Sequence, residues 1–350
     1  MRGVSQRPRC TAPRVREGPQ FASASRALRV RAAANAPQPN QGGEAPPAPP
    51  SPLISRRQLL SLPAPLLLLG AGALLQPAAA LLPAPAAPAA HAAAAAAAGG
   101  IGAGSSGPVL PSPEVKAAVD KALAKAVTKG KAAVALRLPF HDAGTFSGSQ
   151  GGGGLNASVR FELDRPENMG LKRGWRIVEQ LRGDLRGTPA DGCVSDADLV
   201  ALAGAFAVRL CGGPDIAVPI GRPVAAGADP AGRMPGETFS AEQLKAAFAD
   251  KGLSVQEMVA LSGAHTLGSK GFGDPVRFDN EYYTSLLRRP WTNPDDPMAS
   301  MIGLPSDHVL PDDPDCLPYI RTYAEDQDAF FRDFAAAYVK MCALGVPGWA

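Results

Sequence analysis

"LSVQEMVALSGAHTL", residues 253–267, contains the pattern that decides the fold. A second stretch, "VSDADLVALAGAFAV" at residues 194–208, aligns with it without a gap. Each begins with a capping box, the signature of a helix N-terminus, formed by Ser254 with Glu257 and by Ser195 with Asp198. Both then run Val-Ala-Leu-x-Gly-Ala, and the glycine permits close packing against another backbone or a flat ligand. The near-duplication predicts two similar helices, one with His265 where the other has Phe206.

Helical patterns fill most of the chain after residue 108. Residues 112–130 begin with Ser-Pro, a typical N-cap and first helical position, and repeat an apolar residue every four positions. Further helices are predicted at residues 131–142, 169–186 and 325–345. Six glycines make residues 144–158 a loop, and residues 215–223 could form a short strand at most. The predicted fold class is therefore all-α.

Charge is distributed unevenly along the chain. Residues 1–106 hold ten arginines, no lysine and two glutamates, a net charge of +8; because the whole chain carries +3, the remainder carries −5. A mildly acidic body gives no reason to expect a nucleic-acid partner. The body contains four cysteines, Cys193, Cys211, Cys316 and Cys342. They form no CxxC pair, which argues against a disulfide framework or a zinc site and predicts buried thiols.

The first hundred residues have the composition of targeting sequences. Residues 1–50 are rich in Arg, Ser, Ala and Pro and poor in acid, as in a transit peptide. In residues 51–82, Arg56 and Arg57 precede an apolar run that ends in three alanines, the pattern of a twin-arginine export signal. Residues 83–107 form a low-complexity linker, so the folded domain is expected at residues 108–350.

This order of signals predicts a chloroplast protein that passes on to the thylakoid lumen, with the stroma as the alternative. The apolar run is also long enough to span a bilayer. It contains several helix-breaking residues, Pro63, Pro65, Gly70, Gly72 and Pro77. They favour a cleavable signal over an anchor, although membrane helices tolerate such residues, and no stable membrane span is expected after processing.

The body has three histidines, and two of them lie in helical patterns. Arg137 and His141 are four residues apart, so their side chains meet on one helix face. His265 replaces the phenylalanine of the sister helix, so packing alone does not require it. His308 follows a turn and is expected to be solvated. Zinc and nucleophile motifs are absent, and two distant histidines suit a flat metal cofactor gripped between two helices.

Six stretches of the body together resemble one family. They are, in chain order, "LRLPFHDAGTF", "RFELDRPENMGL", "VALSGAHTLG", "FDNEYY", "GLPSDHVL" and "YAEDQDAFFRDFAAAYVKM". The set resembles the plant haem peroxidase superfamily, and most closely the ascorbate peroxidase-related group of chloroplast haem peroxidases. The resemblance implies a two-lobed, all-α fold with haem b between a distal lobe, residues 108–240, and a proximal lobe, residues 241–350.

The resemblance implies roles for the residues of the distal side. Arg137 and His141 match the distal pair, in which His141 moves the proton of hydrogen peroxide and Arg137 stabilises developing charge. Asn168 matches the residue whose carbonyl orients the distal imidazole, and Glu162 matches the acid behind it. Phe140 stands beside the histidine, where ascorbate peroxidases have tryptophan and secretory plant peroxidases have phenylalanine.

On the proximal side, His265 matches the axial ligand of the haem iron and Asp307 the acceptor of its other ring N–H. Thr266 and Asp279 remain of the family's cation site, which would take a monovalent cation or calcium. Asp142 stands where secretory peroxidases have a calcium-binding aspartate, but the rest of that ligand set is missing.

The segment between His265 and Phe278 is shorter than in ascorbate peroxidases. By the resemblance, the missing part holds the proximal tryptophan and the main ascorbate-binding arginine. Ascorbate is therefore expected to be a poor donor. Without the tryptophan, the second oxidising equivalent is expected to stay on the porphyrin.

The function predicted from the resemblance is a haem peroxidase that reduces hydrogen peroxide with small one-electron donors, such as phenolics. It would remove hydrogen peroxide and serve the response to oxidative stress in the chloroplast. The alternative is a haem-free, peroxidase-shaped interaction protein at the thylakoid. Such a protein would be expected to lose the pocket histidines, and this chain keeps both.

Overall fold

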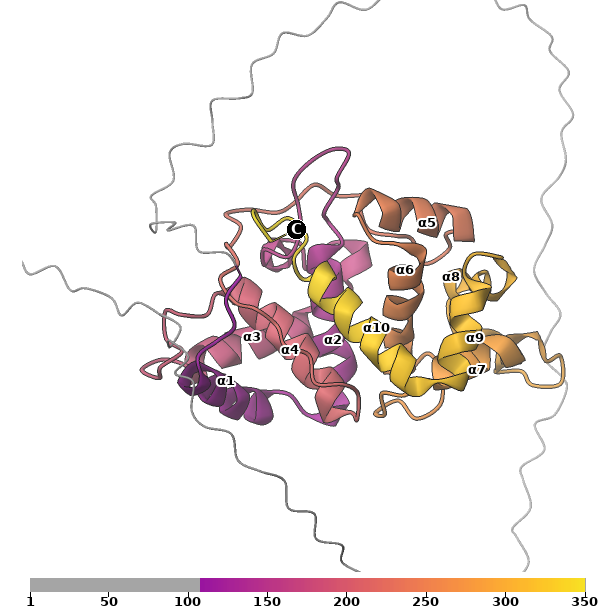
Figure 1. Ribbon diagram of the computed structural model, residues 1–350, viewed down its shortest axis with the longest axis horizontal. Helices are drawn as coiled ribbons and strands as arrows, with labels where there is room; N and C mark the ends of the chain where they lie inside the picture. Colours follow the sequence, from indigo (N-terminus) through magenta and orange to yellow (C-terminus); the bar gives the residue numbers. More distant parts are fainter. Residues whose placement is uncertain (1–107, 350) are drawn as a thin grey trace, which may run out of the picture. The chain divides into compact units, whose positions relative to one another are not determined.

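The computed structural model describes residues 108–349, which are predominantly helical (Figure 1). The α-helices are α1 (Pro113–Ala126), α2 (Lys129–Ala143), α3 (Lys172–Asp184), α4 (Asp196–Leu210), α5 (Ala241–Asp250), α6 (Val255–Ser262), α7 (Glu281–Arg288), α8 (Pro305–His308), α9 (Leu317–Glu325) and α10 (Gln327–Met341). The short 3₁₀ helices are η1 (Ser158–Phe161), η2 (Pro166–Asn168), η3 (Gly263–Thr266), η4 (Pro290–Thr292), η5 (Ala299–Met301) and η6 (Leu310–Asp312). Within the described part of the chain, β-structure is limited to one bridge between Val109 and Ile220. The all-α prediction is confirmed.

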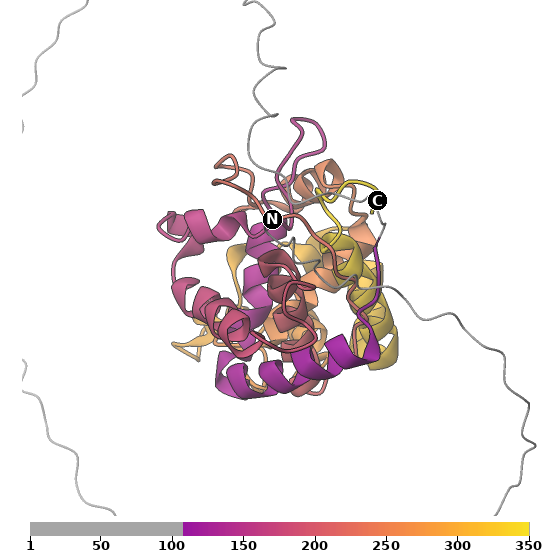
Figure 2. The ribbon, with the colours of Figure 1, turned by 90° about the vertical axis from the view of Figure 1, so that its left-hand side faces the viewer.

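The helices fall into two groups. In Figure 1, α1 to α4 lie on the left and α5 to α9 on the right, while α10 crosses between them. Figure 2, viewed from the left, places the first group in front. Tyr338 of α10 donates its hydroxyl hydrogen to the carbonyl of Ala201 in α4 at 2.8 Å, which ties the last helix to the first group. Helix α5 starts at Ala241, and the lobe boundary at residues 240 and 241 stays a prediction.

The two near-duplicate helices begin alike and end differently. Both predicted capping boxes are present, at Ser195 and at Ser254. Helix α4 continues to Leu210, whereas α6 ends at Ser262 and its last residues tighten into η3. His265 therefore lies on a 3₁₀ turn, which changes the direction in which its side chain leaves the helix.

The shared glycine of the two helices packs closely against side chains of other helices, whereas the prediction named another backbone or a flat ligand. A Cβ on Gly204 would lie 2.2 Å from the Tyr338 hydroxyl and 2.7 Å from Pro139 Cγ. A Cβ on Gly263 would lie 2.4 Å from the Tyr283 hydroxyl. Larger residues at these positions would push α2, α7 and α10 away from the duplicated pair. The glycines thus set the spacing around the helices that carry the histidines.

Three of the four cysteines fulfil the prediction, since Cys211, Cys316 and Cys342 are free and buried. The prediction is wrong for Cys193, which is half-buried and disulfide-bonded. This cysteine lies in the turn before α4 and packs against the edge of the core, where it is only partly buried.

The predicted transit peptide, export signal and linker lie outside the described residues, as does the apolar run that could span a bilayer. Within residues 108–349, no helix is both long and apolar enough to cross a membrane.

Candidate active site

Helix α2 carries a cation and an imidazole in direct contact, with Arg137 half-buried and His141 buried. Arg137 Nε donates to His141 Nε2 at 2.9 Å. The other two guanidinium nitrogens donate to main-chain carbonyls, to Met169 at 2.9 Å and to Glu167 at 2.7 Å. Since all three nitrogens are engaged, the guanidinium has one orientation, with its charge beside the imidazole.

The second ring nitrogen of His141 fixes the tautomer. His141 Nδ1 lies 2.7 Å from Asn168 Oδ1, and Asn168 Nδ2 donates to the carbonyl of Glu162 at 3.0 Å. This amide orientation makes Asn168 an acceptor, so the proton is on Nδ1 and the lone pair is on Nε2. Burial, reinforced by the charge of Arg137, lowers the pKa of His141 to about 4, although the bond to Asn168 opposes the shift. His141 is therefore a neutral base at neutral pH.

Glu162 is next to Asn168, as the sequence implied, but the contact is made by its backbone carbonyl. Its carboxylate accepts from Arg165 at 2.8 Å and from the amide of Asp229 at 2.8 Å. Arg165 also donates to the carbonyl of Asp229. The side chain of Glu162 thus holds the loop in place, and its main chain orients Asn168.

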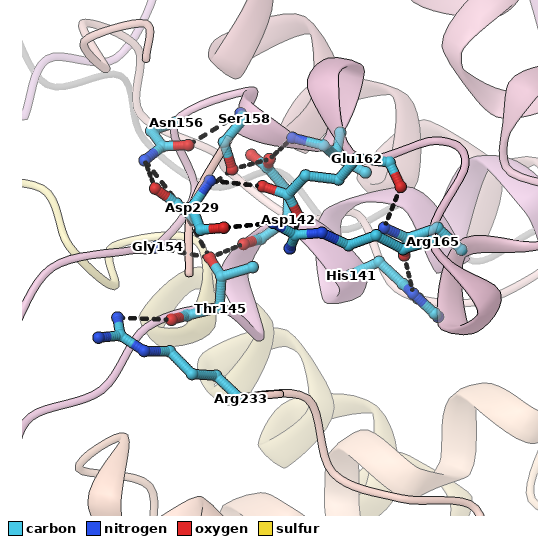
Figure 3. A network of polar contacts seen from close by, with 12 residues as sticks. His141, Asp142, Thr145, Gly154, Asn156, Ser158, Glu162, Arg165, Asp229 and Arg233 are labelled. Carbon is cyan, nitrogen blue, oxygen red and sulfur yellow. Dashed lines mark hydrogen bonds and ion pairs between the residues drawn. The ribbon is translucent and has the colours of Figure 1, made fainter. Parts of the chain in front are cut away.

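A buried polar network ties these pieces together (Figure 3). Asp142 accepts from the amides of Ala157 at 2.6 Å and of Val159 at 2.9 Å, which fixes η1 to the end of α2. Asp229 accepts from Thr145 at 2.8 Å and from Ser158 at 2.9 Å. Sequence reasoning missed Asp229, because its glycine- and proline-rich surroundings carry no periodic signal.

Asp142 is fully buried, and its surroundings raise the pKa of its carboxyl group. Burial raises the pKa of Asp142 to about 7, the two backbone hydrogen bonds lower it, and the charges of Asp229 and Glu162 raise it further. Its carboxylate is occupied by main-chain donors.

Within residues 108–349, no cluster of three or more His, Cys, Asp or Glu side chains is arranged to hold a metal ion.

The proximal residues form a second, separate arrangement. His265 Nδ1 lies 2.8 Å from Asp307 Oδ1. Asp307 also accepts from the Tyr282 hydroxyl at Oδ1 and from the Leu304 amide at Oδ2, both at 2.8 Å. Burial acts to lower the pKa of His265, but the charge of Asp307 outweighs it and the pKa is raised.

His265 has the features of a metal-binding imidazole. Asp307 occupies its Nδ1, and Nε2 has no hydrogen-bond partner among the described residues. The side chain is 37% exposed. A histidine whose Nδ1–H is held by a carboxylate is the usual form of a metal ligand, so the donor set fits haem iron.

The two arrangements lie on segments that face each other. Ala133, one turn before Arg137 on α2, lies 3.1 Å from the position that a Cβ on Gly268 would take, three residues after His265. At the other end of α2, Phe140 stacks on Phe248 of α5 with ring centroids 6.4 Å apart. The side of α2 that carries Arg137 and His141 therefore faces the segment that carries His265.

Thr266 and Asp279 are also brought together. The Thr266 hydroxyl donates to Asp279 Oδ1 at 3.0 Å, and Arg277 pairs with Asp279 Oδ2 at 3.3 Å. The arginine already supplies positive charge at this position. A bound cation stays a prediction.

The expectation for His308 is wrong. Its ring stacks on Trp291 with centroids 4.1 Å apart, and Nε2 lies 2.7 Å from the carbonyl of Ile302. The turn before it is the first turn of α8, which folds the ring back against the chain rather than into solvent.

The residues of both arrangements lie in a segment that is similar to known proteins. The family model described as peroxidase matches residues 115–326, a segment that contains every residue discussed above from Arg137 to Asp307. "Putative L-ascorbate peroxidase 6" of Arabidopsis thaliana is 51% identical over 232 residues, covering 66% of this chain and 69% of the relative. "L-ascorbate peroxidase 5, peroxisomal" of the same plant is 37% identical over 226 residues, with 61% and 76% covered. "L-ascorbate peroxidase 1, cytosolic" of Oryza sativa subsp. japonica is 36% identical over 251 residues, with 67% and 95% covered.

Proposed function

Since the chain belongs to the plant-type haem peroxidase superfamily, in its ascorbate peroxidase-related group, we propose that it binds haem b through His265 and reduces hydrogen peroxide with small one-electron donors other than ascorbate. One observation carries the proposal. A neutral imidazole beside a fixed cation faces a segment whose histidine is backed by a carboxylate. The first arrangement suits proton transfer and the second suits iron ligation.

Bound haem would supply the iron at which peroxide is reduced. The chain supplies the acid–base chemistry around it. The lone pair on His141 Nε2, which accepts from Arg137 Nε in this structure, would take a proton from peroxide once peroxide replaces that N–H, and the same atom would return the proton to the departing oxygen, which leaves as water. Arg137 stabilises the negative charge that develops as the O–O bond breaks. Asn168 keeps the lone pair on Nε2 by holding the Nδ1 proton.

Asp307 acts on the other side by drawing the Nδ1 proton of His265 toward itself. This makes the imidazole a stronger donor to a metal and favours its oxidised states. The apolar ring of Phe140, near the end of α2, packs edge-on against His141 at a centroid distance of 5.9 Å. It contributes to the burial that keeps His141 neutral.

The direct test is a pyridine haemochrome assay on the purified protein. One haem b per chain would support the proposal. A protein that folds but takes up no haem would favour the alternative, a peroxidase-shaped interaction protein.

We expect guaiacol to be oxidised with a higher kcat/KM than ascorbate. Ascorbate is an anion, and a charge-assisted bond to a cation is among the stronger polar contacts that could hold it. The arginine that provides this contact in ascorbate peroxidases belongs to the segment that is missing after His265. Of the cations that remain, Arg277 is paired with Asp279. Steady-state kinetics with both donors at equal peroxide concentration will measure the ratio.

A higher kcat/KM for ascorbate would contradict this prediction. Lys270, half-buried and five residues after His265, would then be the first residue to examine, because its charge acts on His265. Lys129, at the start of α2, is a second cation that could hold the anion. If Lys270→Ala lowered the ascorbate rate alone, this lysine would have replaced the missing arginine.

We also propose that the protein works in the chloroplast and reaches the thylakoid lumen. A fusion of residues 1–110 to a fluorescent reporter is expected to enter chloroplasts and arrive in the lumen. Replacing Arg56 and Arg57 together by lysine should hold the reporter in the stroma. A reporter that protease digests in broken chloroplasts with intact thylakoids would rule out the lumen and leave the stroma.

A further inference from the structure

Tyr282 of α7 shares a carboxylate oxygen with His265. Its hydroxyl donates to Asp307 Oδ1 at 2.8 Å, and His265 Nδ1 lies at the same distance from that oxygen. The tyrosine ring is fully buried and meets the imidazole edge-on, with centroids 6.1 Å apart and an interplanar angle of 81°. Within residues 108–349, no other aromatic ring contacts His265. The peroxide chemistry outlined above makes no use of this side chain.

A phenol in this position is suited to lose an electron. Tyrosine is one of the most easily oxidised side chains, and removal of one electron turns its O–H into a strong acid. The oxidation is therefore favoured where a base already accepts that hydrogen. Asp307 is such a base at hydrogen-bond distance.

The neighbouring tyrosine provides a contrast within the same core. The Tyr283 ring lies 5.0 Å from the Tyr282 ring and is equally buried. Its hydroxyl donates to the main-chain carbonyls of Val259 and Ala260, at 3.0 and 3.2 Å. A carbonyl cannot take the proton of an oxidised phenol, so Tyr283 lacks the hydrogen-bonded base that Tyr282 has in Asp307.

A second tyrosine with a carboxylate lies farther away. The Tyr323 hydroxyl donates to Asp333 Oδ2 at 2.8 Å. Its ring contacts Tyr283 at 5.1 Å, so Tyr283 separates it from Tyr282 and His265. Tyr323 is the rival position, and its distance from the iron ligand makes it the less favoured one.

We propose that Tyr282 is a redox-active tyrosine, which gives one electron to the peroxide-oxidised haem and its phenolic proton to Asp307. The inference rests on the proposed function, because it requires haem on His265. One molecule of peroxide removes two electrons from the haem site, and Tyr282 returns one of them. The products are a neutral tyrosyl radical and a protonated Asp307. An external donor then supplies one electron, and the proton goes back to the phenolate oxygen.

This outcome differs from the expectation drawn from the missing tryptophan, which left the second oxidising equivalent on the porphyrin. By the resemblance, one oxidisable ring, the proximal tryptophan, is absent. Tyr282, on α7, is another oxidisable ring, and its hydrogen bond to Asp307 connects it to His265.

The test is electron paramagnetic resonance of the haem-loaded protein, frozen shortly after mixing with one equivalent of peroxide. The wild type is expected to show a tyrosyl signal that narrows when the protein contains ring-deuterated tyrosine. Tyr282→Phe should lose this signal and show a porphyrin-centred radical instead. Tyr283→Phe, which removes a buried hydroxyl that donates to main-chain carbonyls and not to a carboxylate, is the matched control and should keep the signal.

Haem content and the optical reaction with peroxide are measured on the same samples. If haem is not bound or does not react, the proposed function fails together with the inference. If both are normal and the wild type shows only a porphyrin radical, the inference alone is overturned. Persistence of the signal in Tyr282→Phe, or its loss in Tyr323→Phe alone, also overturns it. Should Tyr282→Phe fail to take up haem, the wild type and Tyr323→Phe decide together: a radical bonded to Asp307 must show a coupling that exchanges in D₂O and must persist in Tyr323→Phe, which removes the tyrosine bonded to Asp333.

Discussion

Replacing His265 with alanine is expected to abolish stable haem uptake. The imidazole is the candidate axial ligand, with Nδ1 held by Asp307 and Nε2 available to a metal. Alanine removes the ligand and leaves the Asp307 carboxylate without its main charged partner, so the cost of burying that charge is no longer offset. The measurement is haem per chain after reconstitution, together with a low-temperature spectrum of the iron.

The control for this experiment is His141→Leu, which removes the histidine of the facing arrangement on α2. That variant should take up haem normally, because His141 Nε2 already accepts from Arg137. Normal haem occupancy and an unchanged iron spectrum in His265→Ala would show that another residue ligates the iron.

The same His141→Leu variant is expected to slow the reaction with peroxide at least about 10²-fold, the lower end of the effect of a positioned general base. Leucine fills a similar volume but has no lone pair to accept the proton. Arg137→Leu should cost less, because charge stabilisation is only part of the step. If stopped-flow spectroscopy shows that His141→Leu reacts with peroxide at the wild-type rate, the assignment is refuted.

The pH profile gives an independent measure of the same residue. A base with a pKa of about 4 is neutral above that value, so the peroxide reaction should lose rate only as pH falls through about 4. The charge of Arg137 is one cause of that low pKa, so Arg137→Leu should move the acid limb to higher pH. Stability follows the same sign. Because the pKa of His141 is lower in the folded state than in the unfolded state, the residue contributes full stability at pH values above its unfolded-state pKa. This contribution is lost as the pH falls through the folded-state pKa of about 4.

The helices and the histidines could be predicted because their signals are local. Capping boxes and four-residue apolar repeats give α1, α4 and α6, and the contrast between Phe206 and His265 marks one histidine as unusual. The end of α6 at Ser262 was not predictable from its own residues. At this point Tyr283, from a later helix, lies so close to Gly263 that a Cβ would not fit, a contact that the local sequence does not encode.

The polar contacts of the site were harder to predict, because they run between loops. The position of Glu162 was foreseen, but not that its main-chain carbonyl makes the contact with Asn168. Asp229 lies 67 residues from Glu162 in sequence, and no motif announces the bond between them. The bond from Tyr282 to Asp307 likewise depends on α7 and α8 packing together, which periodicity does not encode.

The way Arg137 is held determines how much charge it can offer. Its partners are two peptide carbonyls and a neutral ring, and within the described residues no carboxylate forms an ion pair with it. Carbonyl dipoles fix the direction of the guanidinium without cancelling its unit of positive charge. A salt bridge would have given the same rigidity and a pair of zero net charge. The Arg137 guanidinium is therefore held in one orientation, and its positive charge is not neutralised by a paired carboxylate, so it can act on a group that binds beside it.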